Sequence, residues 1–212
     1  MPGLFISFEG GEGSGKTSLG RKLYEELKKR DCNIVWTREP GGCKLSEHIR
    51  GSLLKSCGNF IIGREAELLL FLASRVQHIE EKIHPSLEEG KIVLCDRYHD
   101  SSIAYQGYAR GLGMDYVKKL CSLASHDLWP DLTFYLDLPP EEGILRARGA
   151  SIENLDRIES ESLFFHQKVR EGYHMIAREN TDRFFWIDAK ASEEEVFRQA
   201  LEKINMLLSE NE

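Results

Sequence analysis

Eight consecutive residues near the N-terminus combine glycines with a lysine and a hydroxyl side chain. They are Gly10, Gly11, Glu12, Gly13, Ser14, Gly15, Lys16 and Thr17, and they fit the P-loop spacing G-x-x-x-x-G-K-[ST]. Glycines let the backbone turn tightly and point successive N–H groups at an anion. Lys16 adds a cation, and Thr17 adds a hydroxyl that can reach Mg²⁺. The pattern indicates a binding site for the phosphates of ATP or another nucleoside triphosphate.

A second polar group follows an apolar run further along the chain. Residues 92–95 are apolar and predict a strand, and Asp96, Arg97 and Tyr98 come directly after it. An acidic residue in this position has the form of a Walker B aspartate, which holds a magnesium ion or one of its waters. We therefore expect Thr17 and Asp96 to bind Mg²⁺, Asp96 either directly or through a water molecule.

Several arginines elsewhere in the chain hint at a site for a phosphoryl acceptor. A monophosphate acceptor is already an oxyanion, so it needs cations that hold two repelling phosphates in line rather than a strong base. Arg38 and Arg97 follow predicted strands, and Arg146, Arg148 and Arg157 lie in a stretch with Gly and Asn at its middle. We interpret residues 146–157 as a short lid between two helices. For each single arginine there, a surface ion-pair cluster is the alternative.

A flat ligand could bind to the long helix predicted over residues 64–84. Its apolar positions include Leu69, Ala73, Val76, Ile79 and Ile83, and Pro85 is expected to end it. Phe71 and Arg75 are four residues apart, so their side chains lie on one side of that helix. The ring could stack on a base and the guanidinium could donate to a base carbonyl. A core position for the phenylalanine is the competing interpretation.

Five predicted strands position these groups. Residues 4–8, 34–37, 92–95, 133–138 and 184–187 are apolar runs that alternate with helical patterns. The alternation predicts an α/β fold with a five-stranded parallel sheet, helices on both faces and ligands beyond the carboxyl ends of the strands. Together with the P-loop, the alternation predicts a P-loop nucleotide-binding fold with a short lid. We expect residues 1–212 to form a single domain.

Composition narrows the function classes. The 212 residues are 41% hydrophobic and 30% charged, with a net charge of −7, which argues against a nucleic-acid or anionic-membrane surface. The cysteines, Cys32, Cys43, Cys57, Cys95 and Cys121, form no C-x-x-C pair and are interpreted as reduced thiols. The N-terminus lacks a basic segment followed by a long apolar run. We expect a cytoplasmic protein.

The P-loop alone is compatible with a GTPase, an ATP-driven motor or a small-molecule kinase. The guanine-reading tetrapeptide N-K-x-D is absent from the sequence. The combined motifs resemble those of the thymidylate kinase family through most of the chain. They are Phe8-Glu9-Gly10 into the P-loop, Thr37-Arg38-Glu39-Pro40-Gly41-Gly42, Phe71 with Ala73-Ser74-Arg75, Asp96-Arg97-Tyr98, Ala104-Tyr105-Gln106-Gly107, Pro130-Asp131-Leu132-Thr133 and Leu155-Asp156-Arg157-Ile158-Glu159.

The resemblance implies ATP-dependent phosphorylation of dTMP to dTDP, which feeds dTTP synthesis. It implies that Glu12 receives the 3′-hydroxyl of the acceptor sugar and that Arg38 and Arg97 hold the acceptor phosphate. Phe71 would stack on thymine and Arg75 would donate to a thymine carbonyl. The remaining acceptor residues implied are Ser102 and Gln106 near the base, and Tyr105 against the deoxyribose, where a 2′-hydroxyl would clash.

The P-loop also indicates which type of the family the chain resembles. No basic residue stands beside Glu12, as in the bacterial type whose lid supplies the arginines, so the resemblance gives this role to Arg146, Arg148 and Arg157. It also implies a homodimer. Cys43 departs from the family pattern, which often has a hydroxyl residue there. Another nucleotide kinase and a non-catalytic nucleotide switch are the alternatives.

Overall fold

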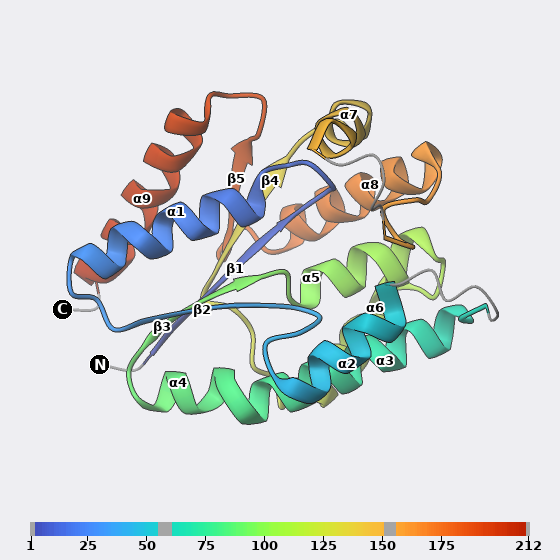
Figure 1. The fold of residues 1–212 in the computed structure, drawn as a ribbon, viewed down its shortest axis with the longest axis horizontal. Coiled ribbons are helices and arrows are strands. Elements are labelled where there is room, and N and C mark those ends of the chain that lie inside the picture. The colour runs from blue at the N-terminus through green and yellow to red at the C-terminus, as the bar shows by residue number, and fades with distance from the viewer. Residues whose placement is uncertain (1–2, 55–60, 151–155, 211–212) are drawn as a thin grey trace.

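A computed structural model describes residues 3–54, 61–150 and 156–210. Its centre is a five-stranded sheet in which every neighbouring pair is parallel, in the order β2-β3-β1-β4-β5 (Figure 1). The strands are β1 (Leu4–Gly10), β2 (Ile34–Arg38), β3 (Ile92–Asp96), β4 (Leu132–Asp137) and β5 (Phe184–Asp188). The predicted fold class is confirmed, and every predicted strand boundary lies within two residues of the observed one.

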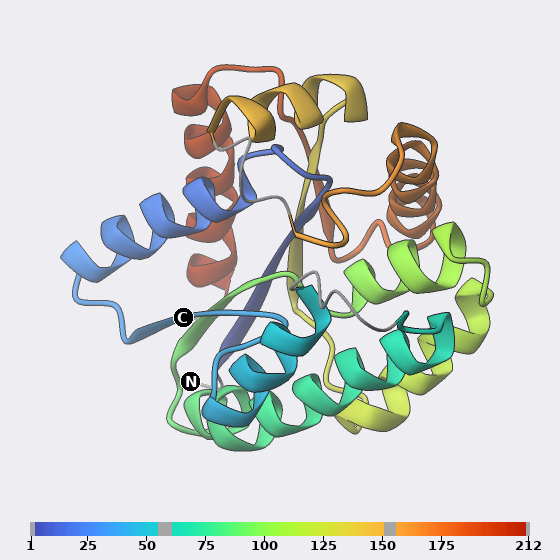
Figure 2. The ribbon, with the colours of Figure 1, turned by 45° about the vertical axis from the view of Figure 1, so that its right-hand side comes forward.

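Helices cover both faces of the sheet. The face formed with α1 (Lys16–Lys29) and α9 (Glu193–Glu210) buries Leu23 and Leu27 against Ile204. The helices of the other face are α3 (Arg64–His78), α4 (His84–Glu88), α5 (His99–Ser102), α6 (Met114–Ser125) and α8 (Leu163–Glu179). Figure 2 shows the sheet between blue α1 and red α9 on one side and the teal-to-green helices on the other.

Two further helices stand at the ligand end of the sheet. Helix α2 (Lys44–Leu54) packs on α3, and α7 (Pro140–Ala150) follows β4 and leads toward the predicted lid. The π-helical segment η2 (Ile103–Ala109) continues α5 and packs against α8. These elements surround the carboxyl ends of β1, β2 and β3, where a doubly wound sheet binds its ligands.

The long helix differs from its prediction in two respects. It continues through Pro85 because a π-helical segment, η1 (Ile79–Ile83), precedes α4 and places the proline in the first turn of α4. There the missing proline N–H costs no intrahelical hydrogen bond. The predicted apolar face is wrong at Leu69, which is 59% exposed, and at Ala73, which is also exposed, whereas Leu68 and Leu72 are buried. The helix therefore packs through a neighbouring stripe, which also contains Arg75.

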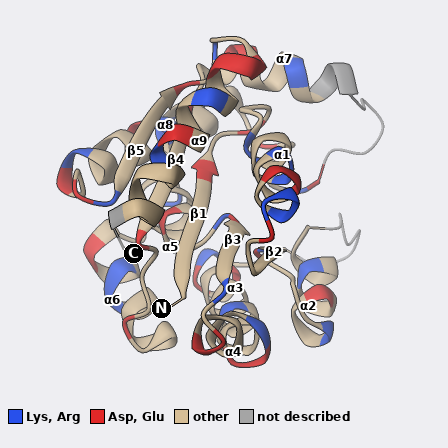
Figure 3. Cartoon of the chain, turned by 90° about the vertical axis from the view of Figure 1, so that its left-hand side faces the viewer, with Lys and Arg blue, Asp and Glu red and all other residues tan. Residues whose placement is uncertain are grey.

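Charge is distributed as in a sheet buried between helices. The strands carry few charged residues, whereas the helices around them carry both signs (Figure 3). No helix within the described ranges is long and apolar enough to cross a membrane. Four of the cysteines, Cys32, Cys43, Cys95 and Cys121, are free, and Cys57 lies outside the described residues.

Candidate active site

The glycines of the P-loop adopt backbone conformations that other residues rarely take. Gly10, Gly13 and Gly15 have φ angles of 147°, 67° and 89°, and Gly15 caps the start of α1. A Cβ on Gly13 would collide with the backbone of Gly143, so the loop packs directly against α7. The buried hydroxyl of Ser14 has no hydrogen-bond partner among the described residues. A loop of this form, ending at a helix N-terminus, suits an anion.

The side chains that could hold magnesium meet between the P-loop and β3. The Thr17 hydroxyl donates to Asp96 Oδ2 at 2.5 Å, and the buried Oδ1 of Asp96 has no partner in the described parts of the chain. No cluster of three or more His, Cys, Asp or Glu side chains that could hold a metal exists within residues 3–54, 61–150 and 156–210. Mg²⁺ commonly takes one or two protein carboxylates plus substrate phosphates, so the hydroxyl and carboxylate fit it.

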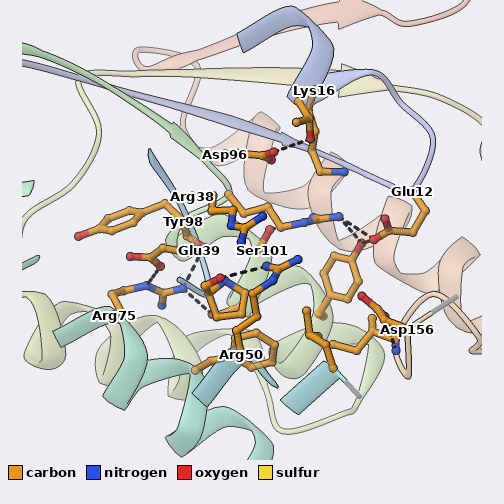
Figure 4. Close-up of a pocket in the computed structure, with 18 of the residues that line it drawn as sticks. Glu12, Lys16, Arg38, Glu39, Arg50, Arg75, Asp96, Tyr98, Ser101 and Asp156 are labelled. Atoms are coloured by element: carbon orange, nitrogen blue, oxygen red, sulfur yellow. Dashed lines mark hydrogen bonds and ion pairs between the residues drawn. The ribbon is translucent and has the colours of Figure 1, made fainter. Parts of the chain in front are cut away.

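Arg97 lies at the centre of a buried polar network. Its Nη2 donates to Glu12 Oε1 at 2.6 Å, and the Tyr105 hydroxyl donates to the same oxygen at 2.9 Å (Figure 4). Its Nη1 donates to the carbonyl of Gly10 and to the hydroxyl of Ser101. Burial alone would raise the pKa of Glu12, but the charges of Arg97 and Lys16 outweigh it and lower the pKa to about 2. Glu12 is therefore ionised within the P-loop.

The backbone of Arg97 contributes to this placement. Its φ of 67° lies in the left-handed region, which is unfavourable for a side chain of this size. Such a conformation persists only where the surroundings determine it. The hydrogen-bond acceptors around the Arg97 guanidinium hold this conformation, and they direct the guanidinium back toward the P-loop.

Arg75 is almost fully buried beside the predicted base pocket. Its Nε donates to Glu39 Oε2 at 2.5 Å, and its Nη2 donates to the carbonyl of Tyr98 and to the hydroxyl of Ser102. Glu39 also contacts His78 Nδ1 at 3.0 Å. Burial disfavours the charged guanidinium, but Glu39 reverses this effect and raises the pKa of Arg75. The guanidinium is thus fixed in position before any ligand arrives.

Two cavities meet at the P-loop. A cavity of about 210 Å³ is lined by the predicted acceptor residues Glu12, Arg38, Phe71, Arg75, Arg97, Ser102, Tyr105 and Gln106. A second cavity of about 690 Å³ is lined by Gly13, Ser14, Gly15 and other residues of α1, α7 and α9. Glu12, Lys16, Thr17 and Glu159 line both cavities. A ligand in one cavity therefore reaches a ligand in the other across these four side chains.

The predicted lid arginines are not gathered at one point. Arg146 lines the larger cavity and donates to the carbonyl of Ala189 at 2.9 Å. Arg157 instead donates to Glu67 Oε2 at 2.6 Å and to the carbonyl of Leu53 at 2.9 Å, so it forms part of an ion-pair cluster in this structure. The side chain of Arg148 lies outside the described residues.

Sequence reasoning assigned no role to several polar residues of the site. Glu9 is the last residue but one of β1 and accepts from the hydroxyls of Ser101 and Tyr173. Arg50 of α2 lines the smaller cavity and donates to the carbonyl of Pro40. Glu39, which follows β2, forms an ion pair with Arg75 of α3. The available signals were that Glu9 lies near a strand end and that Glu39 lies beside Arg38. Arg50 carried no such signal.

The raised pKa of Glu9 should make the free energy of unfolding depend on pH. Burial, followed by the nearby charge of Asp100, raises its pKa from 4.5 to about 7, against the opposing effect of Arg97. The folded state therefore holds this proton more tightly than the unfolded chain. Its contribution to stability is fully present below pH 4.5 and is lost as pH rises to about 7, with a total of about 3 kcal/mol.

A Glu9→Gln variant tests this because it cannot ionise there. We expect the free energy of unfolding of the native chain, relative to that of the variant, to fall between pH 5 and pH 8. Urea denaturation of both proteins at the two pH values measures the difference. An equal change in both proteins would show that Glu9 does not titrate in this range.

The fold and the two joined cavities define a class. A parallel sheet with a P-loop after its central strand, a larger cavity beside that loop and a smaller one lined by arginines and an aromatic ring make a P-loop nucleotide kinase. Comparisons with known proteins then identify the family. A sequence model described as thymidylate kinase matches residues 8–200.

Individual proteins agree with this match. The chain is 49% identical over 205 residues to a thymidylate kinase of Halothermothrix orenii, covering 96% of this chain and 97% of the relative. It is 45% identical over 215 residues to a thymidylate kinase of Protochlamydia amoebophila, covering 99% and 96%. A crystal structure of thymidylate kinase from Ehrlichia chaffeensis superposes with a TM-score of 0.76 at 34% identity, covering 96% of this chain and 99% of that one. The chain belongs to the thymidylate kinase family, enzymes that phosphorylate dTMP to dTDP.

Proposed function

We propose that the chain transfers the γ-phosphoryl group of Mg-ATP to dTMP across the P-loop, with ATP in the larger cavity and dTMP in the smaller one. The observation that carries this proposal is that Glu12, Lys16 and Thr17 line both cavities. Phosphoryl transfer requires donor and acceptor phosphates in line at a cationic point, and Lys16 lies where the cavities join.

The donor side uses the backbone and cations of the P-loop. The N–H groups of residues 10–17 surround the β-phosphate, and Lys16 neutralises charge on the transferring group. Thr17 and Asp96 would hold Mg²⁺, Asp96 directly or through water, and Asp96 Oδ1 has no protein partner in the described residues. When bound, the ion supplies charge neutralisation on the phosphate oxygens.

The acceptor side recognises each part of dTMP with a different group. Phe71 stacks on thymine, and Arg75, Ser102 and Gln106 lie along the base edge. The aromatic ring of Tyr105 packs against the deoxyribose, and its contact with Glu12 keeps that carboxylate where the 3′-hydroxyl can donate to it. The acceptor phosphate is held by Arg97 and by Arg38, whose partner Glu47 is exposed and can exchange for a phosphate.

The lid completes the donor side. Arg146 is the lid arginine already at the larger cavity, and we assign it to the transferring phosphoryl group together with Arg148. Arg157 joins them only by leaving Glu67 and Leu53. A site closed over its substrates excludes water from the transfer, which favours phosphorylation of dTMP over hydrolysis of ATP.

The whole chain acts as a single domain, with residues 146–157 as its lid, in a cytoplasmic homodimer. Exposed apolar residues on α3 and α6 support the dimer: Leu69 is 59% exposed, Tyr116 52% and Leu123 74%. The two helices pack side by side, so these residues can contribute to one surface. Sedimentation equilibrium on the native chain measures the stoichiometry directly.

A coupled ADP-release assay over common nucleoside monophosphates tests the activity. We expect fast turnover with dTMP, slower turnover with dUMP because one methyl group is worth only about 1–3 kcal/mol, and little with AMP. Turnover of AMP or UMP with dTMP inert would overturn the proposal. ATP hydrolysis that no monophosphate accelerates would favour a nucleotide switch instead.

A further inference from the structure

Glu67 is a buried carboxylate on α3, beside the acceptor cavity. Only 1% of it is exposed, yet it receives hydrogen bonds from Gln106 Nε2 at 2.8 Å and from Arg157 Nη2 at 2.6 Å. Arg110 donates to both of its oxygens at 3.3 Å. Burial would raise the pKa of Glu67, but the Gln106 hydrogen bond and the two arginine charges hold it below its ordinary value. Glu67 is therefore an anion.

An anionic Glu67 decides how the Gln106 carboxamide is turned. A carboxylate can only accept hydrogen bonds, so the NH₂ group of Gln106 must face it and the Oε1 atom must face away. Gln106 is 2% exposed and lines the acceptor cavity together with Phe71 and Arg75. No donor of the described residues contacts Oε1. The oxygen is thus available to the cavity as an acceptor of fixed orientation.

Arg75 provides the complementary donor. A guanidinium has five N–H groups. Its Nε, one N–H of Nη1 and both of Nη2 already donate within the described structure, to Glu39, Cys121, Tyr98 and Ser102. One N–H of Nη1 is left for a ligand. The cavity therefore presents one donor from Arg75 and one acceptor from Gln106 to a bound base.

This pair of groups distinguishes pyrimidines by their edges. Thymine and uracil offer a carbonyl at C4 and an N–H at N3, which match a donor and an acceptor in the cavity. Cytosine offers an amino group at C4 and a lone pair at N3, so both contacts would become repulsive. Leaving buried polar groups unpaired in this way is a strong basis for rejecting a substrate.

We propose that Glu67 is a positioning residue that sets the base specificity of the reaction, by holding the Gln106 oxygen toward the base. The inference rests on the proposed placement of thymine in the smaller cavity. Without Glu67, the carboxamide of Gln106 could rotate by half a turn and offer its NH₂ group to N3 of cytosine. With Glu67 in place, the rotated amide would set its oxygen against a buried carboxylate.

A Glu67→Gln variant reverses the constraint with almost no change of shape. Its carbonyl oxygen takes the place of Oε2, which accepts from Arg157 and from Arg110 Nη2. Its NH₂ group takes the place of Oε1, loses the 3.3 Å contact with Arg110 Nε and turns the Gln106 oxygen toward itself. Steady-state kinetics with dTMP, dUMP and dCMP measure the result as three values of kcat/KM. We expect the dTMP:dCMP ratio to fall by about tenfold or more, as expected for one inverted hydrogen bond. The dTMP:dUMP ratio should stay unchanged because the two bases share the edge.

Glu161→Gln is the matched control. Glu161 pairs with Arg110 at 2.6 Å and is not a hydrogen-bond partner of Gln106, so the same change of charge in the same cluster should leave both ratios at their native values. If Glu67→Gln does not fold, Gln106→Leu removes the acceptor directly and should lower the dTMP:dCMP ratio by a similar factor.

The outcomes separate this inference from the proposed function. In one outcome, the native enzyme turns over dTMP but not dCMP, while the Glu67→Gln variant keeps the native dTMP:dCMP ratio. That result overturns the positioning role of Glu67 and leaves the proposed function standing. If the dTMP:dUMP ratio of kcat/KM also fell, the pocket would have loosened in general. That result would also overturn the positioning role. A native enzyme inert toward dTMP would refute the proposed function itself.

Discussion

Replacing Lys16 with alanine is expected to lower kcat by about 10²–10³-fold or more, the usual effect of removing one group that stabilises transition-state charge. Lys16 lines both cavities, where donor and acceptor phosphates meet. The fold should tolerate the change. Among the described residues, the Lys16 ammonium donates only to the carbonyl of Gly11, at 3.1 Å. Burial, followed by the charge of Arg97, lowers the pKa of Lys16, so its charge does not stabilise the folded state.

The measurement combines single-turnover kinetics with thermal unfolding. Lys29→Ala is the control, since Lys29 is an exposed residue in the last turn of the same helix. We expect Lys29→Ala to keep the native rate of phosphoryl transfer. Lys16→Ala should keep the native Tm but lose the native rate. A native rate in the Lys16 variant would mean that the transferring phosphoryl group lies elsewhere, and a collapsed Tm would mean that Lys16 supports the loop.

Local patterns explain why so much of the fold followed from the sequence. Each strand is an apolar run of β-prone residues, and the P-loop spacing fixes both a turn and the start of α1, so neighbours in the chain carry the information. Pro85 was misread because a π-helical segment, which is rare in proteins, precedes it and places it in the first turn of α4. Leu69 was misread because buried polar side chains, among them Glu67 and Arg75, occupy the packed stripe of α3.

The candidate site was predictable only where side chains act from the end of a strand or from a recognised motif. The partners of those side chains are distant in sequence: Arg75 meets Glu39 across 36 positions, and Arg157 meets Glu67 across 90. No periodicity reports such a contact. As a result, the sequence indicates that Arg75 could contact a base and gives no sign that it also neutralises a buried carboxylate.

That second role changes what Arg75→Ala should do. From the sequence, the expected effect is chiefly weaker dTMP binding. In the structure, removing the guanidinium leaves Glu39, which is 5% exposed, with His78 as its remaining side-chain partner. Breaking a buried ion pair from one side typically costs about 3–5 kcal/mol, because an uncompensated charge stays inside. We therefore expect a comparable loss in the free energy of unfolding, together with a higher KM for dTMP.

A double-mutant cycle separates the two roles. Glu39→Gln removes the charge that Arg75 neutralises, so the Arg75→Ala/Glu39→Gln double variant should recover part of the stability lost in Arg75→Ala, whereas its KM for dTMP should remain high. Urea denaturation and steady-state kinetics measure these quantities on all four proteins. Arg38→Ala provides the stability control, since its pair with Glu47 is exposed and worth at most about 1 kcal/mol. Purely additive stabilities would show that Arg75 and Glu39 do not depend on each other, and base recognition would then be the main role of Arg75.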